Sequence, residues 1–390
     1  MTTSFGSKNR NILIVSLQGI GNTALLLPVI HKLANQNVQA LDIVVSNNGS
    51  AQLLLNNPGI RHVYVWDEKE SGLKNVYRLW KEFRGIKYDV TYAAFPNWTR
   101  ENTVALIAAS RKRIGYSGDT KYFSDRILCW FGGLTRPRPI KQHDVLSNLD
   151  LFGLGTEPID LAAKLFHYTK QEMDLNAKLA KKDLSDEDTL IVGLHPGSSA
   201  LEKRWGKDKF SALAIAIAQK HTQVKFLIFG SSVEKEELSA VYRALRGHAS
   251  LLDNLSIRQA AWFISKCDLF VGNDSAPVHL AALQGVPAIA ITGPADYIRT
   301  SPIGKKNIVI RKDLLCSPCY GLARNISKEC LYKLKCIRDI SSAEVFEIVD
   351  RCLKEIIADK YGFDSTKDQV NPCAMTRKEL FSSAIVLNLK

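Results

Sequence analysis

The chain has 390 residues with 46% hydrophobic content, so it is long enough for two domains and too long for one hydrophobic core. Its formal net charge of +13 indicates an acidic partner: nucleic acid, anionic lipid or a phosphorylated substrate. Its apolar runs are too short to span a membrane, and residues 1–10 lack the apolar core of a secretion signal, so we expect a cytoplasmic protein.

The N-terminal half alternates predicted strands with predicted helices. We expect strands at residues 11–17, 41–45, 62–66 and 88–93 and helices at residues 23–33 and 103–110. This alternation is typical of right-handed βαβ units and a parallel sheet.

A glycine turn separates the first strand from the first helix. The run Gly19-Ile-Gly-Asn-Thr-Ala24 fits the dinucleotide-binding pattern G-x-G-x-x-A, and Asp42 follows at about the expected distance. A single match is weak evidence for a nicotinamide or flavin enzyme. The same glycines suit any turn whose backbone must approach a ligand closely.

The strand signals stop between about residues 164 and 188, where charged residues of both signs are mixed. We place a domain boundary in this segment, with an N-terminal lobe at residues 1–175, a second lobe at 176–358 and a tail at 359–390. The second lobe repeats the α/β pattern. Its predicted strands are residues 189–195, 224–229 and 268–271, and its predicted helices are residues 207–220, 233–245, 256–266 and 341–357.

The run from Val271 to Pro287 predicts a strand, a polar turn and a short buried helix. Asp274 and Ser275 are strong N-cap types, and Gly285 is well placed to end the helix. A helix start gathers unpaired N–H groups and the positive end of the dipole, so it favours an anionic ligand such as a diphosphate. Without a ligand, the same run is a well-capped βα junction.

A second polar loop begins at His195, at the end of a predicted strand. Ser198 and Ser199 can donate hydrogen bonds to phosphate oxygens, Lys203 can supply a positive charge, and Trp205 is expected to pack. Glu234, after another strand, either accepts from ribose or sugar hydroxyls or complements a helix dipole.

The cysteines follow an unusual spacing. Their run is C-x2-C-x10-C-x5-C, formed by Cys316, Cys319, Cys330 and Cys336. The first pair suits zinc, whereas the second spacing differs from common zinc ribbons. The cluster is therefore either a structural zinc site or a group of reduced thiols.

Taken together and in this order, the motifs resemble those of glycosyltransferase family 9, the ADP-heptose:lipopolysaccharide heptosyltransferases and their relatives. The resemblance spans roughly residues 10 to 340. It rests on Gly19-Ile-Gly-Asn22 with Pro28, His195-Pro-Gly-Ser-Ser199 with Lys203 and Trp205, Gly230, Gly272-Asn-Asp-Ser-Ala-Pro-Val-His279, and Cys316-Ser-Pro-Cys319. It implies a GT-B architecture, in which two Rossmann-like lobes with parallel sheets face a central cleft. It further implies inverting chemistry with no required metal or other cofactor.

The resemblance also implies roles for individual residues. The donor diphosphate would lie against Ser198, Ser199, Lys203, Asp274, Ser275 and Ala276, with His279 behind them. Glu234 would hold the nucleoside, and Leu255 would lie against the base. The acceptor would approach the loop of Gly19, Gly21 and Asn22 in the other lobe.

Asn22 departs from the family pattern, because the heptosyltransferases carry an aspartate there as general base. An amide cannot accept the acceptor's proton at neutral pH, and general base catalysis commonly contributes about 10²–10⁴-fold. Another group is then the base, or the acceptor differs, or the chain has lost activity.

The resulting hypothesis is an inverting, metal-independent glycosyltransferase that moves heptose from ADP-heptose to a lipopolysaccharide-core or other envelope glycan acceptor. The alternatives are a catalytically silent nucleotide-sugar-binding protein and a GT-B-like sugar-nucleotide epimerase. The basic N-terminal lobe suits an anionic glycolipid acceptor and peripheral contact with the inner face of the cytoplasmic membrane. No zinc-finger spacing, RNP-type strand or basic heptad accompanies the charge, which argues against nucleic acid.

Overall fold

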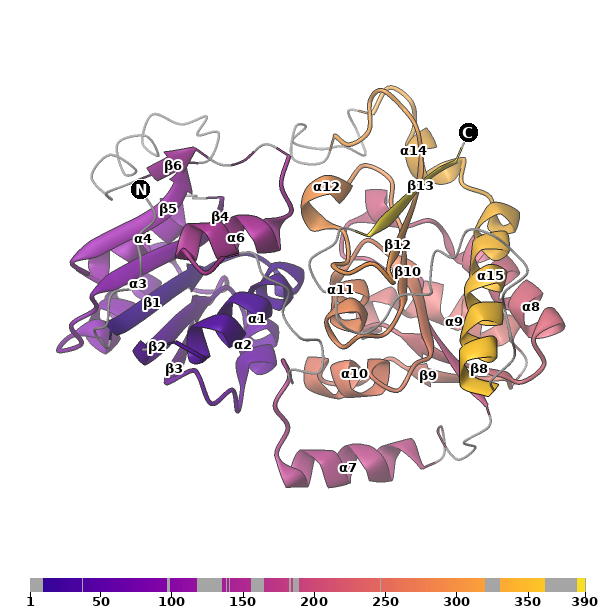
Figure 1. The fold of residues 1–390 in the computed structure, drawn as a ribbon, viewed down its shortest axis with the longest axis horizontal. Helices are drawn as coiled ribbons and strands as arrows, with labels where there is room; N and C mark the ends of the chain where they lie inside the picture. Colours follow the sequence, from indigo (N-terminus) through magenta and orange to yellow (C-terminus); the bar gives the residue numbers. More distant parts are fainter. Residues whose placement is uncertain are drawn as a thin grey trace. The chain divides into compact units, whose positions relative to one another are not determined.

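The computed structural model divides the chain into two compact units (Figure 1). Unit 1 comprises Met1–Ile159 and Lys164–Thr169, and unit 2 comprises Asp160–Ala163 and Lys170–Lys390. The residues that the structure describes are 10–36, 38–96, 99–117, 135–137, 139, 141–155, 165–181, 184, 189–245, 247–319, 330–361 and 384–389.

Unit 1 is a parallel six-stranded sheet with the strand order β3-β2-β1-β4-β5-β6. Its strands are β1 (Arg10–Ser16), β2 (Val38–Val45), β3 (His62–Val65), β4 (Val90–Pro96), β5 (Lys112–Ser117) and β6 (Thr135–Pro137). Its helices are α1 (Ile20–Ala34), α2 (Asn48–Leu54), α3 (Gly72–Phe83), α4 (Thr99–Ile107) and α6 (Asp144–Phe152). The strand order reverses at β1, so the carboxyl ends of β1 and β4 form a topological switch point.

Unit 2 is a parallel seven-stranded sheet with the order β13-β12-β11-β10-β7-β8-β9. Its strands are β7 (Leu190–His195), β8 (Val224–Phe229), β9 (Ala249–Leu252), β10 (Leu269–Asn273), β11 (Ala288–Ile291), β12 (Ile308–Lys312) and β13 (Ile385–Leu389). Its α-helices are α7 (Lys170–Ala180), α8 (Lys207–Lys220), α9 (Lys235–Ala244), α10 (Ile257–Ile264), α11 (Ala276–Leu283), α12 (Tyr297–Thr300), α14 (Lys335–Arg338) and α15 (Ser342–Tyr361), and its 3-10 turns are η1 (Leu201–Lys203) and η2 (Ser232–Glu234). Here the order reverses at β7, which places the switch point between β7 and β10.

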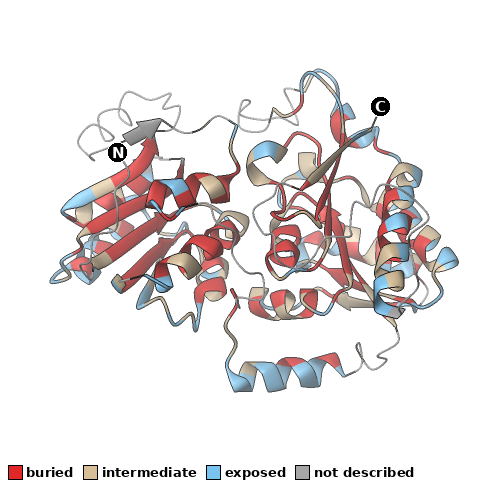
Figure 2. Cartoon of the chain, viewed as in Figure 1, coloured by how far each residue is buried: buried red, intermediate tan, exposed pale blue. Residues whose placement is uncertain are grey.

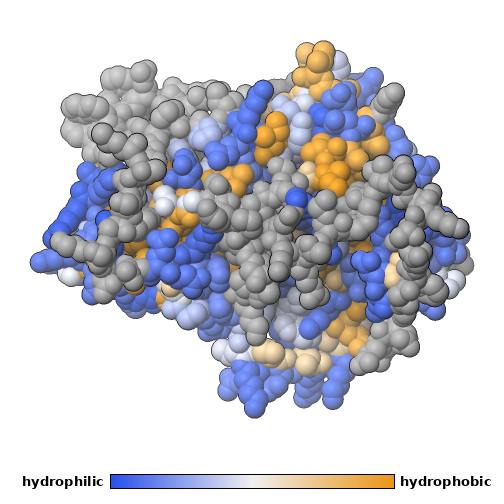
Figure 3. All heavy atoms as spheres, in the orientation of Figure 1, coloured by the Kyte–Doolittle hydropathy of each residue, from blue (hydrophilic) through white to orange (hydrophobic). Residues whose placement is uncertain are grey.

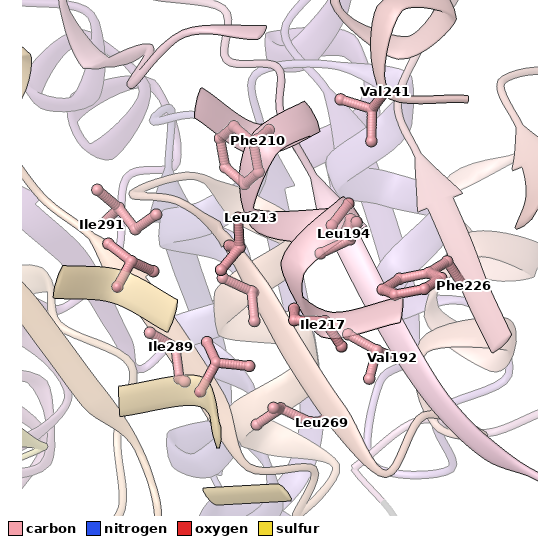
Figure 4. Packing of buried hydrophobic residues seen from close by; sticks show 14 of the residues in the cluster. Val192, Leu194, Phe210, Leu213, Ile217, Phe226, Val241, Leu269, Ile289 and Ile291 are labelled. Carbon is pink, nitrogen blue, oxygen red and sulfur yellow. The ribbon is translucent and has the colours of Figure 1, made fainter. Parts of the chain in front are cut away.

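A hydrophobic core cluster of unit 2 lies between its sheet and the helices α8, α9 and α15. Figure 4 shows Phe210, Leu213 and Ile217 of α8 among side chains of the strands, such as Leu194 and Phe226. The strands β7, β8, β10, β11 and β12 are buried along almost their whole length, whereas the outer faces of the helices are exposed (Figure 2). Burial on both faces explains why these strands are nearly continuous apolar runs in the sequence.

Several predicted elements coincide with observed ones. The helix expected at residues 207–220 is α8, and the strand expected at residues 224–229 is β8. The predicted capping box at the start of α10 is present, because Ser256 Oγ accepts from the Gln259 amide and Gln259 Oε1 accepts from the Ser256 amide.

Two segments differ from the expected organisation. Helix α7 belongs to unit 2, which takes up the chain at Lys170, five residues before the expected boundary at residue 175. Glu172 of α7 forms an ion pair with Arg258 of α10 in the same unit. The expected tail at residues 359–390 contains the end of α15 and β13, which pairs in parallel with β12; residues 362–383 and 390 lie outside the described residues.

Asp42, the acidic residue of the dinucleotide-binding pattern, is not available to bind a cofactor. Asp42 is fully buried in β2, where it accepts two hydrogen bonds from Arg61, at 2.9 and 2.6 Å, and one from Tyr88, at 2.7 Å. An Asp committed to these partners cannot hold a ribose hydroxyl as the pattern G-x-G-x-x-A requires.

Within the described part of the chain, no helix is both long enough and apolar enough to cross a membrane. Most of the coloured surface in Figure 3 is hydrophilic, and hydrophobic residues appear there as separate patches.

Candidate functional site

The polar loops of unit 2 meet at its switch point. His195 is the last residue of β7 and pairs in register with Gly272 of β10, so the chain leaves both strands at the same edge of the sheet. Ligands of open α/β sheets bind at such a point. The residues after β7 (196–206) are called the β7 loop below, and residues 273–275 are called the β10 turn.

The side chain of Asn273 ties the β10 turn to the β7 loop. Its Nδ2 donates to the carbonyls of Pro196, at 2.8 Å, and Gly197, at 2.9 Å, and its Oδ1 accepts from the amide of Trp205, at 2.9 Å. Asn273 is fully buried, so these bonds replace water that the loop backbone would otherwise need. Sequence reasoning missed this residue; an amide at the last position of a buried strand was the available signal.

Lys203 and Asp274 make the second link between the loops. Lys203 ends the 3-10 turn η1, and its Nζ lies 2.7 Å from Oδ2 of Asp274. Asp274 is buried and Lys203 is partly exposed, so the pair lies at the rim of the switch point. The expected cation at the helix start is present and is held there by a carboxylate.

Ser275 is the N-cap residue of α11, as predicted, but its side chain makes no capping hydrogen bond. Its Oγ instead donates to the carbonyl of Asn273, at 3.1 Å, and lies 3.0 Å from Nδ1 of His195. The side chain of Ser275 therefore does not cap α11. In the first turn, Pro277 has no N–H and the amide of Val278 donates to the Ser275 carbonyl at 3.2 Å, which leaves the amide of Ala276 as the donor at the helix start.

His195 joins this network to Glu234. Its Nε2 lies 3.7 Å from Oε1 of Glu234, and both side chains are buried. Burial lowers the pKa of His195, Glu234 opposes this shift, and Arg204 adds to it, so the imidazole is neutral near pH 7. Sequence reasoning did not assign His195 a role of its own, although it ends a buried strand.

Glu234 is the last residue of η2, the turn that leads into α9, and it completes the capping box of this turn with Ser231. Its Oε2 accepts from the amide of Ser231, at 2.9 Å, and from Ser231 Oγ, at 2.8 Å. The helix-start role considered for Glu234 is therefore present. Its other oxygen, Oε1, packs against the backbone of the β7 loop, since a Cβ built on Gly197 would lie 2.2 Å from it.

The remaining predicted donor residues occupy different environments. Ser198 is buried, and its Oγ accepts from the amide of Ala200 at 3.4 Å, whereas Ser199 is exposed. His279 is buried within α11. Leu255 is half-buried in the link between β9 and α10. Trp205 packs as expected: it is buried, and its indole N–H donates to the carbonyl of Ile340 at 2.9 Å.

In unit 1, the predicted acceptor loop lies at the carboxyl end of β1. Gly19 is exposed, and a Cβ built on it would meet no atom within 4 Å, so no protein atom requires a glycine there. Gly21 and Asn22 are half-buried in the first turn of α1. Gln18 donates to the buried carboxylate of Glu101 at 3.1 Å, which brings a carboxylate close to this loop.

The cysteines after β12 are free thiols. Burial raises the pKa of Cys336 to about 12, and interactions with Cys319, Cys330 and Cys316 add to the shift. Across the described residues, no three His, Cys, Asp or Glu side chains form a group that could hold a metal ion. The zinc interpretation of this cluster stays a prediction.

The chain is similar to named heptosyltransferases over part of its length. It is 35% identical over 172 residues to lipooligosaccharide heptosyltransferase 2 of Campylobacter jejuni, covering 42% of this chain and 51% of that protein. The chain thus spans about half the length of this relative. It is 25% identical over 294 residues to lipopolysaccharide heptosyltransferase 3 of Escherichia coli, covering 72% of this chain and 83% of that protein.

Two solved structures share its fold. A glycosyl transferase family 9 protein from Veillonella parvula has a TM-score of 0.73 at 21% identity, covering 90% of this chain and 99% of that chain. The ADP-heptose lipopolysaccharide heptosyltransferase II of Escherichia coli has a TM-score of 0.63 at 19% identity, covering 88% and 99%. Both likenesses agree with a GT-B fold of two Rossmann-like α/β units.

The family model of glycosyltransferase family 9 (heptosyltransferase) matches residues 76–328, more than half of the chain, and this range includes both loops at the switch point of unit 2. The protein therefore belongs to glycosyltransferase family 9.

Proposed function

We propose that the protein is an inverting, metal-independent glycosyltransferase that moves heptose from ADP-heptose to a lipopolysaccharide-core or related envelope glycan. The observation that carries this proposal is the Lys203–Asp274 pair in front of α11, at the switch point of unit 2. A positive side chain and the amides of a helix start there suit a diphosphate.

We assign the donor diphosphate to the β7 loop and the first turn of α11. Lys203 supplies the positive charge, Ser198 and Ser199 donate from their hydroxyls, and the amide of Ala276 donates from the helix start. Because Asp274 already neutralises part of the charge of Lys203, we infer that Lys203 is shared between Asp274 and the phosphate when donor binds. His279 lies behind this turn.

We place the nucleoside beside Glu234 and Leu255. Oε1 of Glu234 would accept from the ribose hydroxyls, while Oε2 stays in its capping box with Ser231. Leu255 would lie against the adenine ring. The ring of His195 would contact the serine of the β10 turn and lie beside the glutamate, which helps to position the serine.

The chemistry follows from this placement. An acceptor hydroxyl attacks the anomeric carbon from the face opposite the leaving ADP, so the configuration inverts in one displacement. Negative charge grows on the diphosphate during this step, and donors fixed in advance stabilise it without reorganising. The acceptor's proton must pass to a base that Asn22 cannot provide as an amide, although Asn22 can orient the hydroxyl.

The acceptor site is proposed at Gly19, Gly21 and Asn22 in unit 1. The open space beside Gly19 supports close approach of a ligand to the backbone. The net positive charge of the chain suits an anionic, membrane-borne glycolipid acceptor and peripheral attachment to an anionic membrane.

Binding of nucleotide diphosphates tests the donor assignment directly. In a thermal-shift panel of ADP, UDP and GDP at equal concentration, we expect the largest stabilisation with ADP. The same panel on Lys203→Ala should give a smaller shift for every nucleotide. Equal shifts for the three nucleotides would remove the adenine assignment, and no shift for any of them would remove the donor site.

Metal independence is tested with a chelator. We expect EDTA to leave the transfer rate unchanged, and loss of the rate with recovery on adding a divalent cation would contradict the proposal.

Zinc analysis of protein purified without a histidine tag separates the interpretations of the four cysteines. About one zinc per chain would indicate a structural site, and less than about a tenth would indicate thiols.

The silent-binding alternative is favoured by one observation, the amide of Asn22 at the position of the family's base. A silent protein would bind the donor and leave it unchanged whatever acceptor is supplied. An epimerase would convert the donor without any acceptor, so product analysis of donor-only reactions separates both alternatives from a transferase.

A further inference from the structure

Helix α3 of unit 1 has a buried face and a second apolar face that is exposed. Leu79 and Phe83 of the buried face pack in the core of unit 1 beside Tyr88 and Val104. Asn75 is also buried and donates to the carbonyls of Asp67, Glu70 and Ser71. These contacts fix which side of the helix faces away from the sheet.

The exposed face carries three large hydrophobic side chains. Leu73, Tyr77 and Trp80 have exposed fractions of 84%, 56% and 42%. Their spacing of four and three residues places them along one side of the helix. Among the described residues of unit 1, only Leu55 is another exposed large hydrophobic residue, so exposed apolar side chains are concentrated on this helix.

Two cations lie over the aromatic rings of this face. The Nζ of Lys81 is 4.8 Å from the centroid of the Tyr77 ring, and the guanidinium of Arg84 is 4.8 Å from that of Trp80. The two rings are stacked, with centroids 6.2 Å apart and planes at 28°. Rings and cations thus form one cluster whose apolar surfaces and positive charges are adjacent.

The neighbouring charges leave this cluster positive. Lys74 pairs with Glu70, at 2.7 Å, and therefore adds little net charge. Glu82 is exposed but lies on another side of the helix, five residues from Tyr77 and two from Trp80. Lys81 and Arg84 are the charges that accompany the exposed rings.

We propose that this surface, the α3 face, defined as Leu73, Tyr77, Trp80, Lys81 and Arg84, docks the protein onto an anionic lipid surface. Aromatic side chains with polar edges are favoured at membrane interfaces, where the ring contacts the acyl boundary and a long cation reaches the headgroups. The positive charges complement anionic headgroups, and the apolar stripe enters the interface as in other amphipathic interfacial helices.

A lipid surface fits the α3 face better than a protein groove does. The three hydrophobic residues form a narrow convex stripe on a helix that already belongs to a folded unit, whereas stable protein interfaces bury broad complementary areas. The biological role of this docking rests on the proposed function, in which the acceptor is a membrane-borne glycolipid. Docking itself requires no turnover, so the two can fail separately.

Vesicle co-sedimentation tests the proposal. The wild-type chain should bind vesicles of phosphatidylcholine with phosphatidylglycerol and bind pure phosphatidylcholine more weakly. Tyr77→Ser/Trp80→Ser and Lys81→Glu/Arg84→Glu should each weaken partitioning onto the anionic vesicles by about tenfold or more. Unchanged thermal unfolding would show that these surface substitutions leave the fold intact.

Matched controls use the same changes elsewhere in unit 1. Leu55→Ser removes an exposed apolar residue away from α3, and Arg111→Glu/Lys112→Glu reverses two exposed charges on another basic segment. Both should bind anionic vesicles as well as the wild type. The proposal is overturned if the wild type does not bind these vesicles, if the α3 variants bind normally, or if the control variants lose as much binding.

A parallel measurement separates docking from catalysis. Transfer to a short, soluble acceptor should be the same for the wild type and both α3 variants. If none of the proteins shows transfer while vesicle binding follows the expected pattern, the proposed function fails and the docking surface stands. Binding of RNA or of a protein in place of vesicles, lost in the same variants, would overturn the lipid assignment.

Discussion

The Nζ of Lys203 lies 2.7 Å from Oδ2 of Asp274, and this ion pair connects the loops that follow two adjacent strands of unit 2. The pair places a positively charged side chain beside the start of α11. A buried carboxylate such as Asp274 also depends on this cation, because an unpaired buried charge is costly. Lys203 therefore has both a structural and a proposed catalytic role, and the two can be separated by mutation.

Lys203→Ala should lower kcat by about 100-fold or more, because the growing charge on the leaving diphosphate loses its fixed cation. The variant should also lose stability, since Asp274 remains buried without its partner. In Lys203→Ala/Asp274→Asn the stability should return while the rate stays low. Lys207→Ala, which removes an exposed pair with Glu236, is the control and should retain both. A normal rate in Lys203→Ala would exclude Lys203 from the mechanism.

Gly197→Ala should weaken ADP binding by roughly tenfold, because its Cβ would displace the Glu234 carboxylate, which lies 2.2 Å from the added atom. Isothermal titration calorimetry with ADP measures the change in the dissociation constant. Glu234→Ala should weaken ADP binding similarly, and adding Gly197→Ala to it should cost little more. Fully additive losses would show that Gly197 acts on the nucleotide without Glu234.

Asn22→Asp should raise kcat by about 100-fold or more on a matched donor and acceptor, since a carboxylate can accept the acceptor's proton at neutral pH. Asn47→Asp, the same change at the N-cap of α2 in unit 1, should leave the rate unchanged because aspartate also caps helices. An unchanged rate in Asn22→Asp would mean that another group already serves as the base.

Stability should fall with pH in a defined acidic range. Burial favours the neutral forms of Asp350 and Glu344, but hydrogen bonds from Lys354, Lys220 and His221 to Asp350, and from Lys312 and Ser341 to Glu344, outweigh it and lower each pKa to about 2. Both carboxylates belong to α15, so the stability that they contribute is present above about pH 4.5.

As the pH falls from about 4.5 to 2, these carboxylates take up protons and their contribution is lost. Urea unfolding over this range should show a falling midpoint. Asp350→Asn should lower the free energy of unfolding at pH 7 by about 1 kcal/mol and flatten this dependence. A variant with the same slope as the wild type would show that other groups control the acid response.

The sequence predicted the elements with the strongest local signals. Helix α8 and strand β8 were predicted at their observed bounds because apolar periodicity and flanking polar residues agree there. Helix α3 and strand β13 were not predicted. The apolar side of α3 is split into a buried and an exposed part, and β13 depends on pairing with β12, far away in the sequence. Pairing of this kind is a tertiary effect that local propensity does not contain.

The contacts within the candidate site likewise depend on tertiary structure and could not be predicted from local sequence. Lys203, Asp274 and Ser275 could be selected from motif order, but their contacts could not. Ser275 was expected to cap its helix, yet its hydroxyl contacts His195 and the Asn273 carbonyl, because both lie at the end of the adjacent strands. Such contacts arise only when β7 and β10 pair in register.

The central claim, transfer of heptose from ADP-heptose, is tested most directly by incubating the wild-type chain with this donor and a lipopolysaccharide-core acceptor that lacks its terminal heptose. Mass spectrometry should detect an acceptor enlarged by one heptose together with released ADP, and the Lys203→Ala chain should form far less of both. Donor that remains unchanged with every such acceptor, or that is converted without one, would contradict the account.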